Sequence, residues 1–125
     1  IRIRPAEEKI RIARAMVLID LKEFSSSLKD LDMAIRMDDR NAKTFLVRAF
    51  VRYQLGAFKE SLSDINKFFS TSNSQNWRAY VLRSAIYRRL RNDVNANQDM
   101  KNALDIATDK QSVRTYFEEL GVADP

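Results

Sequence analysis

Apolar residues recur along this chain at intervals of three and four, the spacing of residues on one face of an α-helix. The first run predicts a helix over about 5–21, beginning near Pro5. Its apolar face holds Ile10, Ala13, Val17 and Leu21. Later runs predict helices over about 24–37, 42–55, 58–70, 75–90, 93–107 and 110–120. The pattern therefore predicts an all-α chain without strands.

Polar or glycine-containing breaks separate the predicted helices. The polar segment 38–41 interrupts the pattern after the second helix, and Gly56 ends the third. The polar segment 70–74 is the clearest loop. Asp109 suits the N-cap of the last helix, and Gly121 ends that helix.

A pattern of one arginine and one aspartate, 16 residues apart, occurs three times. The pairs are Arg14 with Asp30, Arg48 with Asp64, and Arg83 with Asp99. The step between successive arginines is 34 and then 35 residues. A fixed period of this length indicates stacked helical hairpins, each too small to bury a core by itself.

The spacing within each pair places the two residues on facing helices of one hairpin. We expect partly buried ion pairs that fix how the two helices align. The alternative is that these arginines bind a ligand. The structural interpretation is preferred, because a single ligand site would not need the same pair in every repeat.

Composition fits one domain over 1–125 and excludes several kinds of chemistry. The chain has 125 residues, of which 45% are hydrophobic and 31% charged. It has no Cys and no His, so it lacks thiolate chemistry and the commonest general base and metal ligand. No phosphate-binding loop or catalytic set occurs. We expect neither enzymatic activity nor a cofactor or metal.

The chain shows no apolar run long enough to cross a membrane and no signal peptide. An intracellular, cytoplasmic location is expected, and an organelle stays open. Because the chain starts with Ile1 almost directly in a helix, it is interpreted as part of a longer protein. We expect the first helix to expose apolar surface, since no capping helix precedes it.

The residues of each hairpin resemble the tetratricopeptide repeat (TPR). The large and small residues at its close helix crossing are matched by Phe45 with Ala49, and by Tyr80 with Ser84. Its turn is matched by 56–58. The small residues of the second helices are Ser27, Ser61 and Ala96. The repeats cover about 8–41, 42–75 and 77–108, with a capping helix over about 110–120. The resemblance implies a right-handed superhelix whose first helices line a concave groove for peptides or other proteins.

Positive charge gathers on the expected first helices of the hairpins. The net charge is +5, and 75–92 holds five arginines and no acid. The bases outside the Arg–Asp pairs are Lys9, Lys43, Arg52, Arg78, Arg88, Arg89 and Arg91. They form either a solvated face or the edge of a groove for an acidic ligand.

Apolar residues at positions expected to face the groove suit an amphipathic partner segment. They are Ile12, Met16, Ile19, Leu46, Phe50, Tyr53, Val81 and Ala85. The alternative is that they belong to the core, which is favoured for Ile12 and Val81. Phe50 and Tyr53 are expected to be the apolar anchors, with Arg88 and Arg89 as the charged flank. The predicted partner-binding set is Lys43, Leu46, Phe50, Tyr53, Arg78, Arg88 and Arg89.

The resemblance also excludes one kind of partner. Many TPR proteins hold a terminal carboxylate of a peptide with Lys, Asn and Arg on their first helices. At the matching positions this chain has Ile12, Met16, Val47, Arg78 and Leu82, so only Arg78 survives. A role in binding chaperone tails is therefore not expected.

Two other functions stay open. The basic fifth helix, with Tyr80, Tyr87 and Trp77 for stacking, could contact RNA. These aromatics also match positions where TPR helices pack together, and packing is the preferred interpretation for Trp77. A third possibility is a peripheral subunit of a large complex, with the basic helix on anionic lipid or on another subunit.

Overall fold

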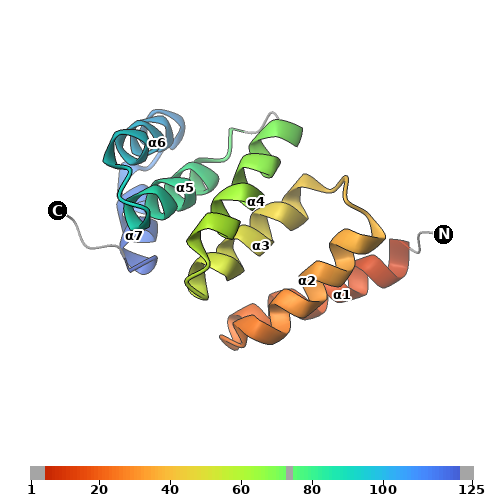
Figure 1. Cartoon of the computed structure of the whole chain (residues 1–125). Coiled ribbons are helices and arrows are strands. Elements are labelled where there is room, and N and C mark those ends of the chain that lie inside the picture. The colour runs from red at the N-terminus through yellow and green to blue at the C-terminus, as the bar shows by residue number, and fades with distance from the viewer. Residues whose placement is uncertain (1–4, 73–74, 122–125) are drawn as a thin grey trace. The chain divides into compact units, whose positions relative to one another are not determined.

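The computed structural model describes residues 5–72 and 75–121, and side chains from residue 6 onward (Figure 1). These residues form seven helices. The bounds are α1 Pro5–Asp20, α2 Phe24–Met37, α3 Ala42–Gln54, α4 Phe58–Thr71, α5 Trp77–Arg89, α6 Asp93–Ile106 and α7 Lys110–Glu119. No strand occurs among the described residues. The predicted all-α class is thus confirmed. The fifth helix starts later than predicted, at Trp77, because Asn76 is its N-cap.

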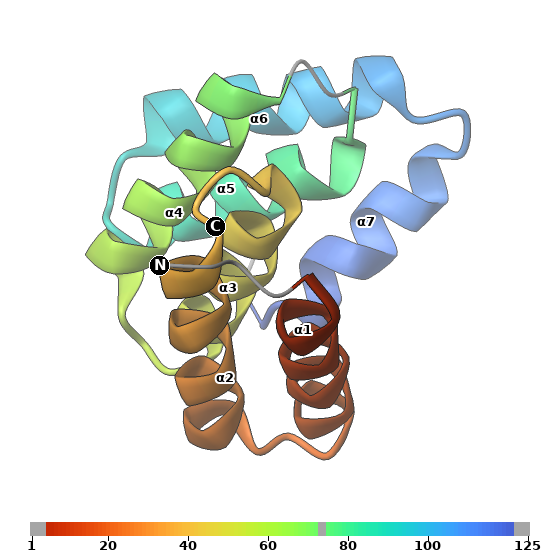
Figure 2. The same ribbon diagram turned by 90° about the vertical axis from the view of Figure 1, so that its right-hand side faces the viewer.

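Contacts divide the chain into two compact units, Ile1–Ser72 and Asn73–Pro125. In the first unit α1 packs on α2 and α3 packs on α4, and α2 also packs against α3 (Figure 2). In the second unit α5 packs on α6, and α7 packs mainly against α5. The second unit is therefore one hairpin with a capping helix. No described helix is long and apolar enough to span a membrane.

A hydrogen bond from a serine to an alanine joins the two helices of every hairpin. The Ser27 hydroxyl donates to the Ala15 carbonyl oxygen at 3.0 Å, and Ser61 donates to Ala49 at 2.6 Å. In the third hairpin the pair is exchanged between helices, since Ser84 of α5 donates to Ala96 of α6 at 2.8 Å. All six residues are fully buried. The exchange preserves both the small volume and the hydrogen bond.

The tight turn inside each hairpin contains one residue with a left-handed backbone. These residues are Lys22 with φ 60°, Gly56 with φ 80° and Arg91 with φ 61°. They occupy the same position, since the steps between them are 34 and 35 residues. Only Gly56 has the side chain that favours this conformation. The turn geometry is therefore repeated even where the sequence disfavours it.

The structure shows which apolar residues of α1 and α5 are buried. Ile10 and Val17 of α1, and Leu21 just after its end, are exposed, and the helix buries Ala15 against Leu31 of α2 and Val51 of α3. This exposure agrees with the expectation that the first helix presents apolar surface. Val81 of α5 is fully buried, which agrees with the preferred assignment of Val81 to the core. Ala85 is fully buried as well, so its expected place in a groove is wrong.

Candidate functional site

The three Arg–Asp pairs form, one in each hairpin. The Nε atoms of Arg14, Arg48 and Arg83 lie 2.8, 3.0 and 2.8 Å from the Oδ2 atoms of Asp30, Asp64 and Asp99. In each pair Nη2 also donates to Oδ1, so the contact is bidentate. This fork geometry is the strongest form of an arginine–carboxylate contact. The 16-residue spacing thus predicts these contacts correctly.

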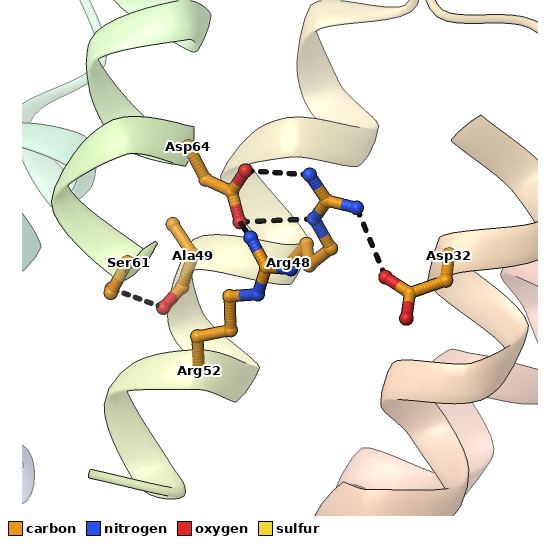
Figure 3. Close-up of polar contacts among 6 residues, drawn as sticks. All are labelled: Asp32, Arg48, Ala49, Arg52, Ser61 and Asp64. Carbon is orange, nitrogen blue, oxygen red and sulfur yellow. Dashed lines mark hydrogen bonds and ion pairs between the residues drawn. The ribbon is translucent and has the colours of Figure 1, made fainter. Parts of the chain in front are cut away.

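Asp64 is the centre of a wider network (Figure 3). Besides Arg48, it accepts a hydrogen bond from Nη1 of Arg52 at 2.9 Å. Arg48 also donates through Nη1 to Asp32 of α2 at 3.0 Å. One arginine therefore joins its own hairpin to the preceding one. Arg52, which lies outside the three Arg–Asp pairs in sequence, is part of this network.

The arginine beside Asp30 changes how that carboxyl titrates. The side-chain hydrogen bond from Arg14 lowers the pKa of Asp30, and the charge of Arg11 acts in the same direction. The pKa of Asp30 is lowered despite the burial of the group, which acts in the opposite direction. Asp30 is thus held in its charged form in the folded protein.

Of the two expected apolar anchors, Tyr53 is wrongly assigned. It is only 4% exposed, and its ring centre lies 5.5 Å from that of Phe58 at the start of α4. Since it packs between the two helices of a hairpin, it belongs to the core. Phe50 is half-buried and makes an edge contact with Phe24 of α2, with 6.4 Å between ring centres. Leu46 is half-buried.

Arg88 and Arg89 make contacts within the second unit rather than forming a free charged flank. Nη2 of Arg88 donates to Oδ1 of Asn97 in α6 at 2.9 Å, and its guanidinium lies 5.7 Å from the ring centre of Phe117. Nη2 of Arg89 donates to the carbonyl oxygen of Gly121 at 3.0 Å. Both side chains therefore help to hold α6 and the end of α7 on α5.

Lys43 and Arg78 each lie beside a small cavity at the start of a first helix. In the first unit a cavity of about 130 Å³ lies between α1 and α3. Its lining residues are Ile12, Met16, Asn41, Lys43, Thr44 and Val47. Three of these, Ile12, Met16 and Val47, stand where the family resemblance places carboxylate-binding residues. The structure thus puts an apolar surface at these positions.

The second unit has a comparable cavity, of about 260 Å³, between the start of α5 and α7. Its walls include Trp77, whose ring centre lies 6.2 Å from that of Tyr116 in α7. The guanidinium of Arg78 covers the Trp77 ring at 4.4 Å. Trp77 is half-buried, so it both packs on the capping helix and faces this cavity.

The same sequence pattern opens both of these helices, and it was not recognised from the sequence. Asn41 accepts a hydrogen bond from the backbone N–H of Lys43, and Asn76 accepts one from that of Arg78. An asparagine followed two residues later by a base thus places a cap and a cation at each helix start. The helix dipole adds to the attraction for anions there. The repeat period could have revealed this pair.

A third cavity, of about 200 Å³, lies among α5, α6 and α7. Its apolar walls are Met100, Leu104 and Phe117, and Arg88, Arg114 and Glu118 also line it. No group of three or more Cys, His, Asp or Glu that could hold a metal occurs within 5–72 and 75–121.

Comparison with known proteins supports the fold. No protein-family model matches the chain, and no curated protein sequence does. Solved structures do match, among them the first TPR domain of Spaghetti (RPAP3) bound to the HSP90 peptide SRMEEVD. That match has a TM-score of 0.82 and 15% identity, and covers 97% of this chain and 95% of that one.

Two further structures agree. The TPR domain of Arabidopsis OM64 has a TM-score of 0.80 and 18% identity, with 90% of this chain and 93% of that chain covered. The Yersinia enterocolitica type III secretion chaperone SycD, in complex with a peptide of the translocator YopD, has a TM-score of 0.80 and 11% identity, with 97% of each chain covered. The chain therefore has the TPR fold.

Proposed function

We propose that this chain is a protein-interaction scaffold that holds an acidic or amphipathic segment of a partner protein against its first helices. It carries out no reaction of its own in this proposal. The main support for this proposal is the shared start of α3 and α5. Each of these helices begins with an asparagine N-cap and a base beside a cavity. Each of these helix starts thereby offers cationic and apolar contacts side by side.

Bases on the first helices of the hairpins share one position in the repeat. Lys9, Lys43 and Arg78 follow one another at steps of 34 and 35 residues, and all three are exposed. Lys43 makes no ion pair or side-chain hydrogen bond to a described residue. An unpaired cation at the start of a helix favours an acidic partner, through its own charge and through the helix dipole.

Solved structures of the same fold provide independent support. The Spaghetti domain holds a peptide of HSP90, and SycD holds a peptide of YopD. The similarity of these proteins to this chain is one of fold, and the HSP90 and YopD peptides are ligands of those proteins. What carries over to the proposal is the type of ligand, a short segment of another protein.

The test is a selection of binding segments from a random peptide library, displayed with both ends fused to a carrier. We expect the selected segments to be rich in Asp or Glu. Reversing the charge of Lys43 (Lys43→Glu) should weaken their binding by roughly tenfold, or about 1.4 kcal/mol. The matched control is Lys29→Glu on the exposed side of α2, which should leave binding unchanged. Failure to select any segment would contradict the proposal.

The salt dependence of binding separates this proposal from RNA binding. Single-stranded RNA should lose affinity steeply and log-linearly as salt rises, whereas a peptide held partly by apolar contacts should lose less. The contacts of α5 favour the peptide. The Arg83 guanidinium lies 5.8 and 6.0 Å from the ring centres of Tyr80 and Tyr87, so these rings already stack on an arginine of the protein.

A further inference from the structure

The cavity between α1 and α3 has the size of a single side chain. Its volume is about 130 Å³. A cavity of about 150 Å³ with apolar walls accommodates one benzene molecule. The space therefore suits one aliphatic side chain and is too small for a helix or for several side chains at once.

The walls of this cavity are suited to apolar contact. Ile12 and Met16 contribute from α1, and Val47 contributes from α3. Met16 is 43% exposed, so a methionine side chain that could pack in the interior is instead open to solvent. An aliphatic group that enters would remove part of these surfaces from water, which is favourable in proportion to the area buried.

The polar part of the lining is confined to the start of α3. Asn41 caps the helix, and Lys43 is the charged residue of the lining. The acids Asp38 and Glu8 interact with Arg40 rather than with Lys43. Asp38 accepts a hydrogen bond from Arg40 at 3.0 Å, and the charge of the buried Glu8 acts on the same guanidinium. The charge of Lys43 is thus left for a ligand.

Thr44 supplies a second observation that points to a ligand. It is 2% exposed and lines the cavity, and its hydroxyl oxygen Oγ1 has no hydrogen-bond partner among the residues that the structure describes. Buried hydroxyl groups are nearly always hydrogen-bonded, so an orphaned one requires an explanation. A backbone group of an entering segment, which carries both a donor and an acceptor, would satisfy it.

From these contacts we propose that the cavity between α1 and α3 binds one aliphatic side chain, Leu, Ile or Met, from an internal segment of a partner protein, with an adjacent Asp or Glu contacting Lys43. This inference rests on the proposed function and names the chemistry of its ligand. It also separates the site from one for a free carboxyl terminus, because three of the six lining residues are apolar and only Lys43 is cationic.

The experiment uses two variants of the whole chain and the segments selected from the random library. Met16→Lys places a charge in the cavity wall. Val17→Lys places the same charge on the neighbouring residue of α1, which is 57% exposed and does not line the cavity. Both residues are exposed, so both variants should fold, which circular dichroism verifies.

We expect the selected segments to carry an aliphatic residue beside an acid. Met16→Lys should weaken their binding at least about tenfold, and Val17→Lys should leave it within about twofold. Replacing the aliphatic residue of the segment by serine should cause a similar loss. The peptide SRMEEVD, with its free carboxyl terminus, should bind more weakly than these segments do.

Three results would overturn the inference. The segments could bind Met16→Lys as well as the original chain, they could lack the aliphatic residue, or SRMEEVD could bind more tightly than any internal segment. In each case peptide binding itself stands, and only the cavity assignment fails. If the library yields no binder, the proposed function fails along with the inference.

Discussion

At the residue scale, the most informative feature is the sharing of Asp64 between two arginines. It is almost fully buried, and three charge-assisted hydrogen bonds reach its two oxygens. A buried carboxylate of this kind adds little net stability compared with an apolar replacement, but removing one partner leaves the others without compensation. The network therefore fixes the alignment of the helices more than it strengthens the fold.

Removal of the Asp64 carboxylate should destabilise the folded protein. Asp64→Ala should lower the free energy of unfolding by about 1–3 kcal/mol, because Arg48 and Arg52 lose their shared partner. The comparison is Asp32→Ala, which removes a carboxylate that is 40% exposed and should cost less than about 1 kcal/mol. Denaturant unfolding measures both. An equal cost for the two variants would contradict the structural role of Asp64.

A second prediction at this scale concerns how the stability contributed by Asp30 depends on pH. The pKa of Asp30 is lowered from the ordinary value of 3.8, chiefly by the hydrogen bond from Arg14. A carboxyl group with a lowered pKa stabilises the folded state fully above its unfolded pKa, and this contribution is lost as the pH falls through the folded pKa. The difference in unfolding free energy between the original chain and Asp30→Asn should thus be constant near neutral pH and shrink below about pH 4. A difference that stays constant down to pH 2 would contradict this linkage.

At the scale of the helices, sequence reasoning succeeded where the pattern is local. The 3.6-residue periodicity located all seven helices, and the caps at Gly56, Asp109 and Gly121 are confirmed. It gave no sign of the left-handed backbone in the turns of the first and third hairpins. There Lys22 and Arg91 adopt the conformation of Gly56 because the packing of the two helices fixes the turn. The residue type at a turn position does not show that helix packing fixes the turn.

These turns give a matched set of substitutions. Lys22→Gly and Arg91→Gly should each stabilise the protein by roughly 0.5–1 kcal/mol, since relief of the left-handed backbone outweighs the extra entropy of glycine in the unfolded chain. Gly56→Ala should destabilise it by about 1 kcal/mol through backbone strain alone, because the added Cβ would meet no atom within 4 Å. Thermal unfolding compares the three. If the two glycine variants prove less stable than the original chain, the turns do not carry the inferred strain.

At the scale of the whole molecule, the repeat period predicted the fold, but only part of the candidate site. Position in the repeat told which helix a residue lies on, and Lys43 and Arg78 are indeed exposed at helix starts. Position in the repeat does not show that the Tyr53 side chain is buried between the two helices of its hairpin. It also does not show that Arg88 and Arg89 contact α6 and the end of α7. Those outcomes depend on how side chains from different helices share space, which no single-helix pattern contains.

The exposed apolar residues of α1 yield a prediction about association. Ile10 and Val17 of α1 and Leu21 just after its end are 65%, 57% and 64% exposed. Exposed apolar surface promotes contact with other apolar surfaces. Replacing all three by glutamine should reduce binding of a hydrophobic dye and any self-association seen by sedimentation. If the dye signal of the original chain is already absent, these residues do not act as an apolar patch.

Binding of a partner segment to the face of α1 and α3 can be tested by the methyl resonances of the four methionines. Met16 lines the cavity between α1 and α3, Met33 and Met37 lie on α2, and Met100 lines the cavity among α5, α6 and α7. The chain labelled with ¹³C at these methyl groups is titrated with a segment selected from the library. The account predicts a saturable shift of the Met16 resonance, with the other three unchanged. A shift at Met100, Met33 or Met37 while Met16 stays in place would contradict it.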